Sequence, residues 1–332
     1  MSELSFDTGF PLEGAASRRT LDPARRYDVL VLGAGPAGIS AAIYLVRKGL
    51  ATGVLGSLLG GQVVWTSGIA NYLGYRLVDG ASLVERFREQ VAELAPDLGL
   101  GLEATGVERR GDGFAVLAGG AAYAARTLVV ATGKRPRLLE VPGERRLLGR
   151  GVAYCALCDA PLYRGKPVAV VGGGNSGLEA AIDLARICPR VHLFQDLERL
   201  TGDAVFAERV RAAPQVELHL GMRVEEILGD ERVRAVRARP AAGGDPLEIP
   251  VAGVFVQVGL APNSELLRGL APMNARGEIE VDCACRTAVP GLFAAGDVTA
   301  VPYKQIVIAA GEGAKAALSA YEHLLRLGAG PG

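Results

Sequence analysis

Two cysteines three positions apart are the residues of this chain best suited to chemistry. Cys155 and Cys158 are the first and last residues of the tetrapeptide Cys-Ala-Leu-Cys. Two cysteines with this spacing can form a small reversible disulfide, and the motif can lower the pKa of one thiol. A zinc ribbon would need a second pair of this kind, but Cys283 and Cys285 are separated by a single residue. The pattern therefore favours redox chemistry, and we expect no metal site.

Asp159 follows this pair directly. Opening a disulfide releases a thiolate that needs a proton donor nearby, and the motif contains no histidine. We therefore interpret Asp159 as the best local general acid–base, the alternative being an ordinary surface aspartate. His192 and His219 fall inside expected strands, and we assign no role to them, to His323 or to the three remaining cysteines.

Two glycine-rich turns are the second feature with chemical meaning. Each follows an apolar strand and precedes a helical pattern, at residues 33–38 and 172–177. In such a turn the first glycine permits the bend, the second lets the backbone approach a pyrophosphate, and the third lets the helix pack on the strand. The N-terminus of the helix adds N–H donors. One turn alone is a weak signal, but two in this context indicate two dinucleotide sites.

The residues after each turn bear on the choice of nucleotide. A dinucleotide fold is expected to place an acidic residue about twenty positions on, for the ribose hydroxyls. Residues 52–56 contain no carboxylate, whereas Gln195 and Asp196 stand at the corresponding place after the second turn. A 2′-phosphate would call for a cluster of cations, and only Arg199 is close. We therefore expect Gln195 and Asp196 to bind the nucleotide, and NADH to be favoured over NADPH.

The elements around these turns predict the fold. A chain of 332 residues is long enough for about two domains, and 45 glycines with 5% aromatic residues favour tight strand-to-helix turns. The tail has a strand at 291–295 and a helix at 305–327 but no glycine turn, so we expect it to complete the first domain. The prediction is an α/β protein of two three-layer, Rossmann-like domains, with the second inserted in the first. Its parts are an N-terminal extension (1–26), the first domain (27–137 and 263–328) and the inserted domain with the cysteine pair (138–262).

Composition excludes several classes of function. Because 36 basic side chains balance 36 acidic ones, we expect no nucleic-acid or membrane partner. Residues 1–26 carry many charges and no apolar core of signal-peptide length, and no apolar run approaches a membrane span. Five cysteines are too few for a disulfide framework. We therefore expect a cytoplasmic protein.

Several segments together resemble the low-molecular-weight bacterial thioredoxin reductases. They are the two glycine turns, Gly-Gly-Gln at 60–62, Cys-Ala-Leu-Cys-Asp at 155–159 and Ala-Ala-Gly-Asp at 294–297. Within that superfamily, residues 173–184, 301–305 and 311–315 are most similar to the flavoprotein subunit of alkyl hydroperoxide reductase. The likeness runs from about residue 26 to residue 326.

This resemblance implies a homodimer in which electrons pass from the nicotinamide to FAD and then to the cysteine pair. Cys158 would face the flavin, and Cys155 would attack the disulfide of a partner protein. The resemblance also implies a rotation between the domains, about residues 135–137 and 260–262. The implied FAD contacts are Gly33, Gly35, Gly38, Gly61, Gln62, Asn71, Thr132, Gly133, Asp297, Lys304 and Gln305, and the implied nucleotide contacts are Gly172, Gly174 and Ser176.

The sequence differs from these families in features that bear on the electron acceptor and on the choice of nucleotide. The hydroperoxide reductase flavoprotein carries an N-terminal thioredoxin-fold domain, where this chain has about 26 residues. We therefore expect the electrons to leave for a separate thioredoxin or glutaredoxin-like protein, which could feed a peroxiredoxin. The His-Arg-Arg type cluster for a 2′-phosphate is absent, and Gln195 stands where NADH-using relatives have Glu. The alternatives are a flavin-bound redox sensor and a ferredoxin or small-molecule reductase, which would not need the cysteine pair.

Overall fold

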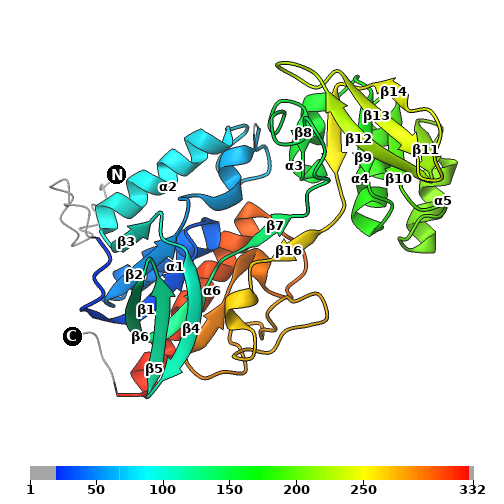
Figure 1. Cartoon of the computed structure of the whole chain (residues 1–332). Helices are drawn as coiled ribbons and strands as arrows, with labels where there is room; N and C mark the ends of the chain where they lie inside the picture. The colour runs from blue at the N-terminus through cyan, green and yellow to red at the C-terminus, as the bar shows by residue number, and fades with distance from the viewer. Residues whose placement is uncertain (1–19, 67, 329–332) are drawn as a thin grey trace, which may run out of the picture.

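Two lobes joined by a pair of strands make up the computed structural model, which describes residues 20–66 and 68–328 (Figure 1). The chain enters the second lobe after β7 (Lys134–Pro136) and leaves it before β16 (Leu260–Pro262), and these two strands pair antiparallel. Both predicted Rossmann-like domains are present, the second inserted in the first. We propose domain boundaries at these two strands. Most of the predicted N-terminal extension, residues 1–19, lies outside the described residues.

The first lobe is built on one mixed sheet with the strand order β3-β2-β1-β6-β5-β4, in which β17 also pairs with β6. Strands β3, β2, β1, β6 and β17 run parallel, and β4, β5 and β6 form an antiparallel meander. The strands of this sheet are β1 Arg26–Leu32, β2 Thr52–Gly56, β3 Asp97–Leu100, β4 Ala104–Arg110, β5 Gly113–Ala118, β6 Ala121–Val130 and β17 Leu292–Ala294.

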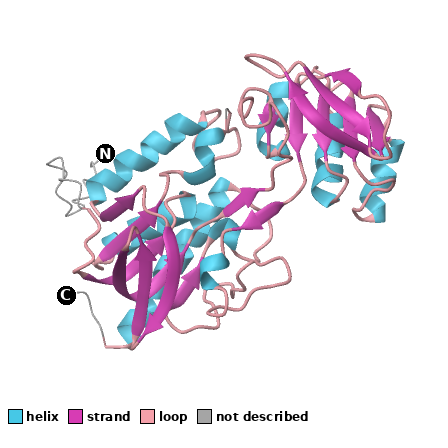
Figure 2. Cartoon of the chain, in the orientation of Figure 1, coloured by secondary structure: helices cyan, strands magenta, loops and turns pink. Residues whose placement is uncertain are grey.

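Alternation along β1 divides the core of this lobe into two layers. Val29 and Val31 pack against the helices α1 (Pro36–Arg47) and α6 (Ile306–Arg326). Leu30 and Leu32 point to the other face and pack against β5. Figure 2 shows the helices of this lobe beside its sheet. The remaining helices of the lobe are α2 Gly80–Leu94 and the short 3-10 turns η1 Gly61–Trp65, η3 Glu265–Leu267 and η4 Gly296–Val298.

The second lobe repeats this plan with a parallel sheet of order β11-β10-β9-β15-β8. Val168 and Val170 of β9 pack against α4 and α5, whereas Ala169 and Val171 face an antiparallel sheet of β12, β13 and β14. Burial of both faces suits a parallel sheet. The elements are β8 Val152–Ala153, α3 Ala156–Asp159, η2 Ala160–Tyr163, β9 Val168–Val171, α4 Asn175–Ala185, β10 Val191–Gln195, α5 Ala204–Ala212, β11 Val216–Leu220, β12 Met222–Leu228, β13 Ala235–Pro240, β14 Leu247–Pro250 and β15 Gly253–Val256.

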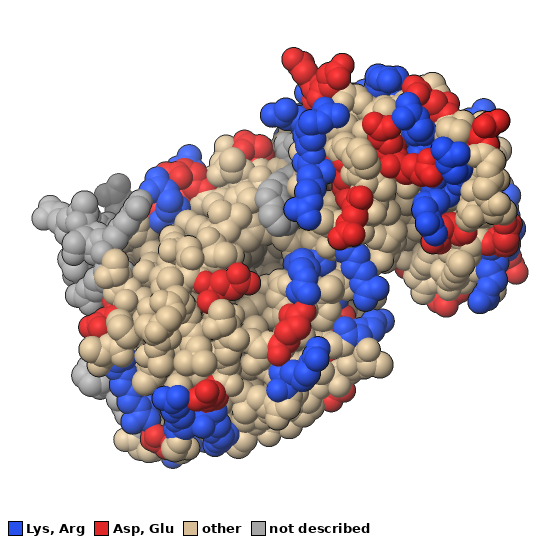
Figure 3. Space-filling view, in the orientation of Figure 1, with Lys and Arg blue, Asp and Glu red and all other residues tan. Residues whose placement is uncertain are grey.

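Charged side chains of both signs are interspersed over the second lobe on the face seen in Figure 3. In the antiparallel sheet Arg237 of β13 lies opposite Glu226 of β12 and Glu248 of β14, and it forms ion pairs with both, its Nη2 atom lying 3.5 Å from Glu248 Oε2. Such opposed charges on neighbouring strands each stabilise the pairing by a fraction of a kcal/mol, roughly 0.2 to 1 kcal/mol. Among the helices at 20–66 and 68–328, none is long and apolar enough to cross a bilayer.

The helices after the glycine turns begin earlier than their apolar pattern suggests. α1 begins at Pro36 and α4 at Asn175, because Gly35 and Gly174 serve as their N-caps. Helix α2 was not expected from periodicity. It begins after Asp79, whose side chain accepts a hydrogen bond from the Ser82 amide, a capping signal that the sequence does contain.

Candidate functional site

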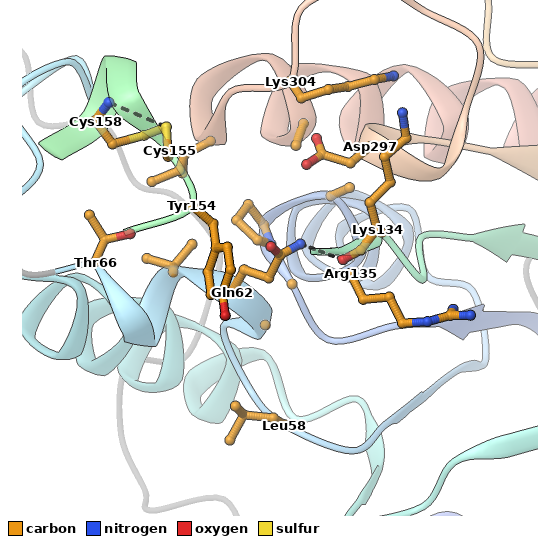
Figure 4. A pocket seen from close by; sticks show the side chains of 18 of the residues that line it. Leu58, Gln62, Thr66, Lys134, Arg135, Tyr154, Cys155, Cys158, Asp297 and Lys304 are labelled. Atoms are coloured by element: carbon orange, nitrogen blue, oxygen red, sulfur yellow. Dashed lines mark hydrogen bonds between the residues drawn. A yellow bond between two sulfur atoms is a disulfide. The ribbon is translucent and has the colours of Figure 1, made fainter. Parts of the chain in front are cut away.

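A cavity of about 400 Å³ lies where the two lobes meet. The first lobe lines it with the first glycine turn, residues 132–135 and residues 304–306, and the second lobe lines it with residues 152–155. Figure 4 shows the cysteine pair at one side of this cavity and Asp297, Lys304 and Lys134 at another. The cavity therefore joins a strand-to-helix nucleotide turn with the predicted redox pair.

The first glycine turn has the backbone geometry that a dinucleotide requires. Gly33 has a φ of +113° and a Cβ there would lie 2.1 Å from the Ala131 carbonyl oxygen, so the bend needs glycine. A Cβ on Gly38 would lie 1.8 Å from the Gly33 oxygen, which fixes how closely α1 packs on the turn. A Cβ on Gly35 would meet nothing within 4 Å, so the backbone there is open to the cavity. Because Gly35 is the N-cap of α1 and has no side chain, no side-chain hydrogen bond caps the first amides of the helix. These amides are therefore available to bind a pyrophosphate.

Charged side chains that are at least partly buried line another part of the cavity. Burial raises the pKa of the Asp297 carboxyl, although the charges of Lys304 and Lys134 oppose this shift. Burial also lowers the pKa of Lys304, whose ammonium donates to the carbonyl oxygens of Thr299, at 2.8 Å, and of Val301. A carboxylate and an ammonium held in this partly dry region can orient polar groups of a bound cofactor.

Lys134 is held in place by a buried carboxylate. Its ammonium forms an ion pair with Glu278, and both side chains are less than a tenth exposed. Burial alone would raise the pKa of Glu278, but hydrogen bonds from Lys134, Asn274 and Arg276 outweigh it and lower the pKa to about 2. The Lys134 carbonyl oxygen accepts a hydrogen bond of 2.5 Å from the Gln62 amide, which points into the cavity in Figure 4. The first residue of β7, Lys134, is thus held through both its side chain and its backbone carbonyl.

Most of the residues expected to contact FAD meet at this cavity, and two do not. Gly38 lies in α1 and faces the backbone of Gly33 rather than the cavity. Asn71 is exposed and does not line the cavity, but its side-chain amide donates a 2.9 Å hydrogen bond to the side-chain oxygen of Gln305, which does. The lining includes the expected residues Gly33, Gly35, Gly61, Gln62, Thr132, Gly133, Asp297, Lys304 and Gln305.

Three supporting residues were missed from the sequence. Asn263 exchanges hydrogen bonds with Thr132, at 2.6 and 2.9 Å, and so fixes the loop that ends β6. Buried Glu312 accepts from the Gly296 amide at 2.7 Å and fixes the turn that carries Asp297. The third is Glu278, described above. The sequence signal for Glu312 was a carboxylate among small residues in the first, mostly apolar part of a helix.

Cys155 and Cys158 form a disulfide with their Cα atoms 5.3 Å apart, as the spacing predicts. Cys155 is the N-cap of α3, and its sulfur accepts a hydrogen bond of 3.2 Å from the Cys158 amide (Figure 4). Both cysteines are half-buried and line the cavity. A main-chain N–H directed at a sulfur favours its thiolate, so Cys155 has the environment of a nucleophile after reduction.

Asp159 is buried at 9% exposure and also lines the cavity. Burial raises the pKa of its carboxyl from 3.8 to about 6, and its Oδ1 atom has no hydrogen-bond partner within residues 20–66 and 68–328. A carboxyl that lies next to a disulfide and whose pKa is raised toward neutral pH can donate its proton to a departing thiolate. The surface interpretation of Asp159 is therefore wrong.

The second glycine turn has the same geometry as the first, although it does not line the cavity. Gly172 has a φ of +121° and a Cβ there would lie 2.4 Å from the Gln257 oxygen. A Cβ on Gly177 would lie 1.8 Å from the Gly172 oxygen, whereas one on Gly174 would meet only the Thr201 hydroxyl at 3.8 Å. Ser176 stands in the first turn of α4. This turn can receive a second dinucleotide, apart from the first site.

Gln195 ends β10 beside this second turn, and Asp196 follows it. Gln195 is buried and packs on Gly173, where a Cβ would lie 3.0 Å from its Cγ atom, and its amide donates weakly, over 3.4 Å, to the Arg199 oxygen. Asp196 and the side chain of Arg199 are exposed. The side chain that packs against the second glycine turn, Gln195, is therefore neutral, whereas the charged Asp196 and Arg199 point into solvent.

Comparisons with known proteins agree with this geometry. The profile of the pyridine nucleotide-disulphide oxidoreductases matches residues 27–313. The F subunit of alkyl hydroperoxide reductase in Pseudomonas putida is 45% identical over 95% of this chain and 62% of its own length, and that of Escherichia coli strain K12 is 43% identical over 97% and 62%. The chain thus spans less than two thirds of the curated relatives it matches.

Solved structures with this fold include thioredoxin reductases. The enzyme of Streptococcus pyogenes MGAS5005 superposes with a TM-score of 0.86 at 34% identity, covering 91% of this chain and 99% of that one. The Lactococcus lactis thioredoxin reductase described as the FR conformation gives 0.64 at 33% identity, covering 90% and 99%.

Proposed function

The chain belongs to the pyridine nucleotide-disulphide oxidoreductase family, and we propose that it passes electrons from a nicotinamide nucleotide through FAD and the Cys155–Cys158 dithiol to a thioredoxin or glutaredoxin-like protein. The family and these relatives make it an NAD(P)H-dependent disulfide oxidoreductase that uses a flavin and a pyridine nucleotide. The observation that carries the finer proposal is the disulfide lining the same cavity as the first glycine turn.

FAD, when bound, supplies the two-electron exchange between the nicotinamide and the disulfide. On our proposal the open backbone at Gly35 and the first amides of α1 bind its pyrophosphate. The half-buried Asp297 and the Gln62 and Lys304 side chains orient its remaining polar groups, while the walls of both lobes exclude water. Gly172, Gly174 and Ser176 bind the nicotinamide nucleotide on the second lobe.

The cysteines take different roles in the proposed disulfide exchange. Two electrons break the Cys155–Cys158 bond, and the carboxyl of Asp159 donates a proton to one of the two sulfurs. The Cys155 thiolate, stabilised by the Cys158 amide, attacks a partner disulfide and forms a mixed disulfide. Cys158 then returns its proton to Asp159 and attacks the Cys155 sulfur, which restores the starting bond. The two partner thiolates that leave take up two protons from water, so the partner is released as a dithiol. Cys158 is accordingly the sulfur that we place next to the flavin.

A rotation between the lobes is part of the proposal. The disulfide lines the cavity while the second glycine turn lies outside it, so one arrangement does not present both groups to the first site. Strands β7 and β16 are the only covalent connections between the lobes within the described chain, and we place the hinges there. The two thioredoxin reductase structures support this, because they match with nearly the same identity and coverage but with TM-scores of 0.86 and 0.64.

Reconstitution tests the proposed function. Mixing the holoenzyme, NADH and an oxidised thioredoxin-fold dithiol protein should form two partner thiols for each NADH consumed, at a catalytic rate. If a peroxiredoxin and peroxide replace the dithiol protein, NADH loss should be slow until that protein is added back. If NADH is lost equally fast with and without the dithiol protein, the enzyme reduces the peroxiredoxin directly and the proposed intermediary is wrong. A slow response without new thiols would favour a flavin-bound sensor instead.

We further propose that the protein works in the cytoplasm, which its balanced charge and its few cysteines support, and that it forms a homodimer.

We also propose that NADH is the preferred nucleotide, because a neutral amide at Gln195 and the exposed Asp196 leave a 2′-phosphate without a built cation site. The kcat/KM for NADH should exceed that for NADPH by about tenfold or more. Gln195→Arg should narrow the difference, whereas Gln195→Glu should widen it. An NADPH value equal to the NADH value in the wild-type enzyme would contradict the proposal.

Asp159→Asn should separate the proton-donor role from simple packing. Disulfide reduction should slow by about 10- to 100-fold, while reduction of the flavin by NADH keeps its rate. Because the pKa in the folded protein, about 6, lies above 3.8, the folded protein holds this proton more tightly and loses stability as pH rises from 4 through 6. The asparagine variant should therefore be more stable than the wild type at pH 8, by up to about 3 kcal/mol in urea unfolding. An unchanged rate of disulfide reduction would exclude Asp159 as the donor.

A further inference from the structure

A cluster of two histidines and a glutamate lies in the second lobe, outside the disulfide chemistry. β10 and β11 are neighbouring parallel strands, and their register places His192 opposite Glu217 and Phe194 opposite His219. Since side chains two residues apart point to the same face, His192, Glu217 and His219 share one face of the sheet. Figure 1 shows β10 and β11 on the side of this lobe away from α3, which carries the cysteine pair.

The donor atoms of this cluster have the spacing of metal ligands. His192 Nδ1 lies 3.1 Å from His219 Nε2. Glu217 Oε2 lies 3.7 Å from His192 Nδ1, and Glu217 Oε1 lies 3.7 Å from His219 Nε2. One donor atom from each residue can be chosen so that all three lie within 4.8 Å of one another. Zinc binds imidazole nitrogens and carboxylate oxygens at about 2.0 to 2.2 Å in tetrahedral sites, which separates neighbouring ligand atoms by roughly 3.4 Å. Each of these three separations is within a few tenths of an ångström of that value, with one Glu217 oxygen facing each imidazole.

The protein also prepares these side chains for a cation. Both imidazoles are only 12% exposed, which restricts the positions that their ring nitrogens can take. The His219 ring stacks on Phe194 with centroids 4.6 Å apart, which limits its rotation. Glu217 is half exposed, so solvent reaches the third ligand and a fourth position is open to water.

The competing explanation is a hydrogen bond between the two imidazoles, with Glu217 paired to Arg190 at 3.4 Å. That arrangement accounts for the short nitrogen–nitrogen distance. It does not require the carboxylate to lie equally close to both ring nitrogens, as it does here. The Arg190 side chain is more than half exposed, so it can leave Glu217 when a cation enters.

We propose that His192, Glu217 and His219 bind one zinc ion or a similar divalent transition metal. This proposal departs from the expectation of no metal and is independent of the flavin and disulfide chemistry. The ion would link β10 to the edge strand β11. β10 ends at Gln195, beside the second glycine turn. Metal binding would therefore stabilise the edge of the nucleotide lobe.

Zinc chloride titrated into the holoenzyme tests this site, with binding followed by calorimetry and equilibrium dialysis. The Cys155–Cys158 disulfide is kept oxidised and the exposed Cys283 is replaced by serine, because free thiols also bind zinc. We expect one zinc per chain, an increase in melting temperature with zinc, and no comparable effect of magnesium, which prefers oxygen ligands.

Matched variants decide whether the three side chains are the ligands. His219→Ala and Glu217→Gln should each weaken zinc binding at least tenfold, whereas His323→Ala, on α6, should leave it unchanged. Glu217 is half exposed, so its glutamine variant tests the site without disturbing the core. Failure of zinc to bind the parent protein would overturn the proposal. Equal zinc affinity in the parent and the Glu217→Gln variant would overturn it too.

Discussion

Replacement of Cys158 by serine should abolish disulfide reduction while FAD stays bound. The serine hydroxyl cannot form or reopen the bond to Cys155, so the variant should turn over a dithiol partner on the order of a thousandfold more slowly or worse. The glycine turn and the Asp297 region hold the cofactor from other segments of the cavity, so the flavin content, measured by its absorbance per chain, should not change. NADH should still reduce the flavin.

Cys155→Ser should lose turnover to the same extent but behave differently in a trapping experiment. Cys158→Ser leaves the Cys155 thiol to attack the partner, and the mixed disulfide should persist because no second thiol resolves it. Cys155→Ser should trap little or no partner. Cys283→Ser, at an exposed cysteine away from the pair, is the matched control and should keep the full rate. Full partner turnover by Cys155→Ser would show that the proposed exchange is wrong.

A single methyl group on each glycine turn should separate the two nucleotide sites. Gly35 and Gly174 have ordinary φ values of −79° and −83°, and a Cβ on either has room in the protein itself. The methyl would instead occupy the space through which the backbone approaches a pyrophosphate. Gly35→Ala should therefore fold but bind FAD at least tenfold more weakly, measured by flavin retained after gel filtration and by titration of the apoprotein.

Gly174→Ala is the matched counterpart in the second lobe. It should retain FAD fully and raise the KM for NADH at least tenfold, with disulfide exchange from chemically reduced enzyme unaffected. Gly33→Ala would be a poor test, because its φ of +113° and the 2.1 Å approach to the Ala131 oxygen would strain the fold itself. Normal FAD affinity in Gly35→Ala, or lost FAD in Gly174→Ala, would contradict the assignment of the two turns.

Local sequence determined the parts of this protein that are made within a few residues. The strands before the two turns, the turns and the disulfide all follow from short patterns, because backbone sterics and chain connectivity fix their geometry locally. Gly33 and Gly172 need positive φ values wherever the turn sits, and Cys155 and Cys158 are close by spacing alone. The nucleotide turns and redox pair were therefore predictable, as was the two-domain plan.

Tertiary structure alone decided which of these parts meet and how buried they are. The Lys134–Glu278 pair joins residues 144 positions apart and the Asn71–Gln305 hydrogen bond joins residues 234 apart. The pKa of Asp159 rises because packing takes its carboxyl out of water, and a five-residue motif carries no information on burial. His192, Glu217 and His219 cluster only because two parallel strands pair in one register. Long-range docking sets register and burial, and it depends on the free energy of the whole chain rather than on any short segment.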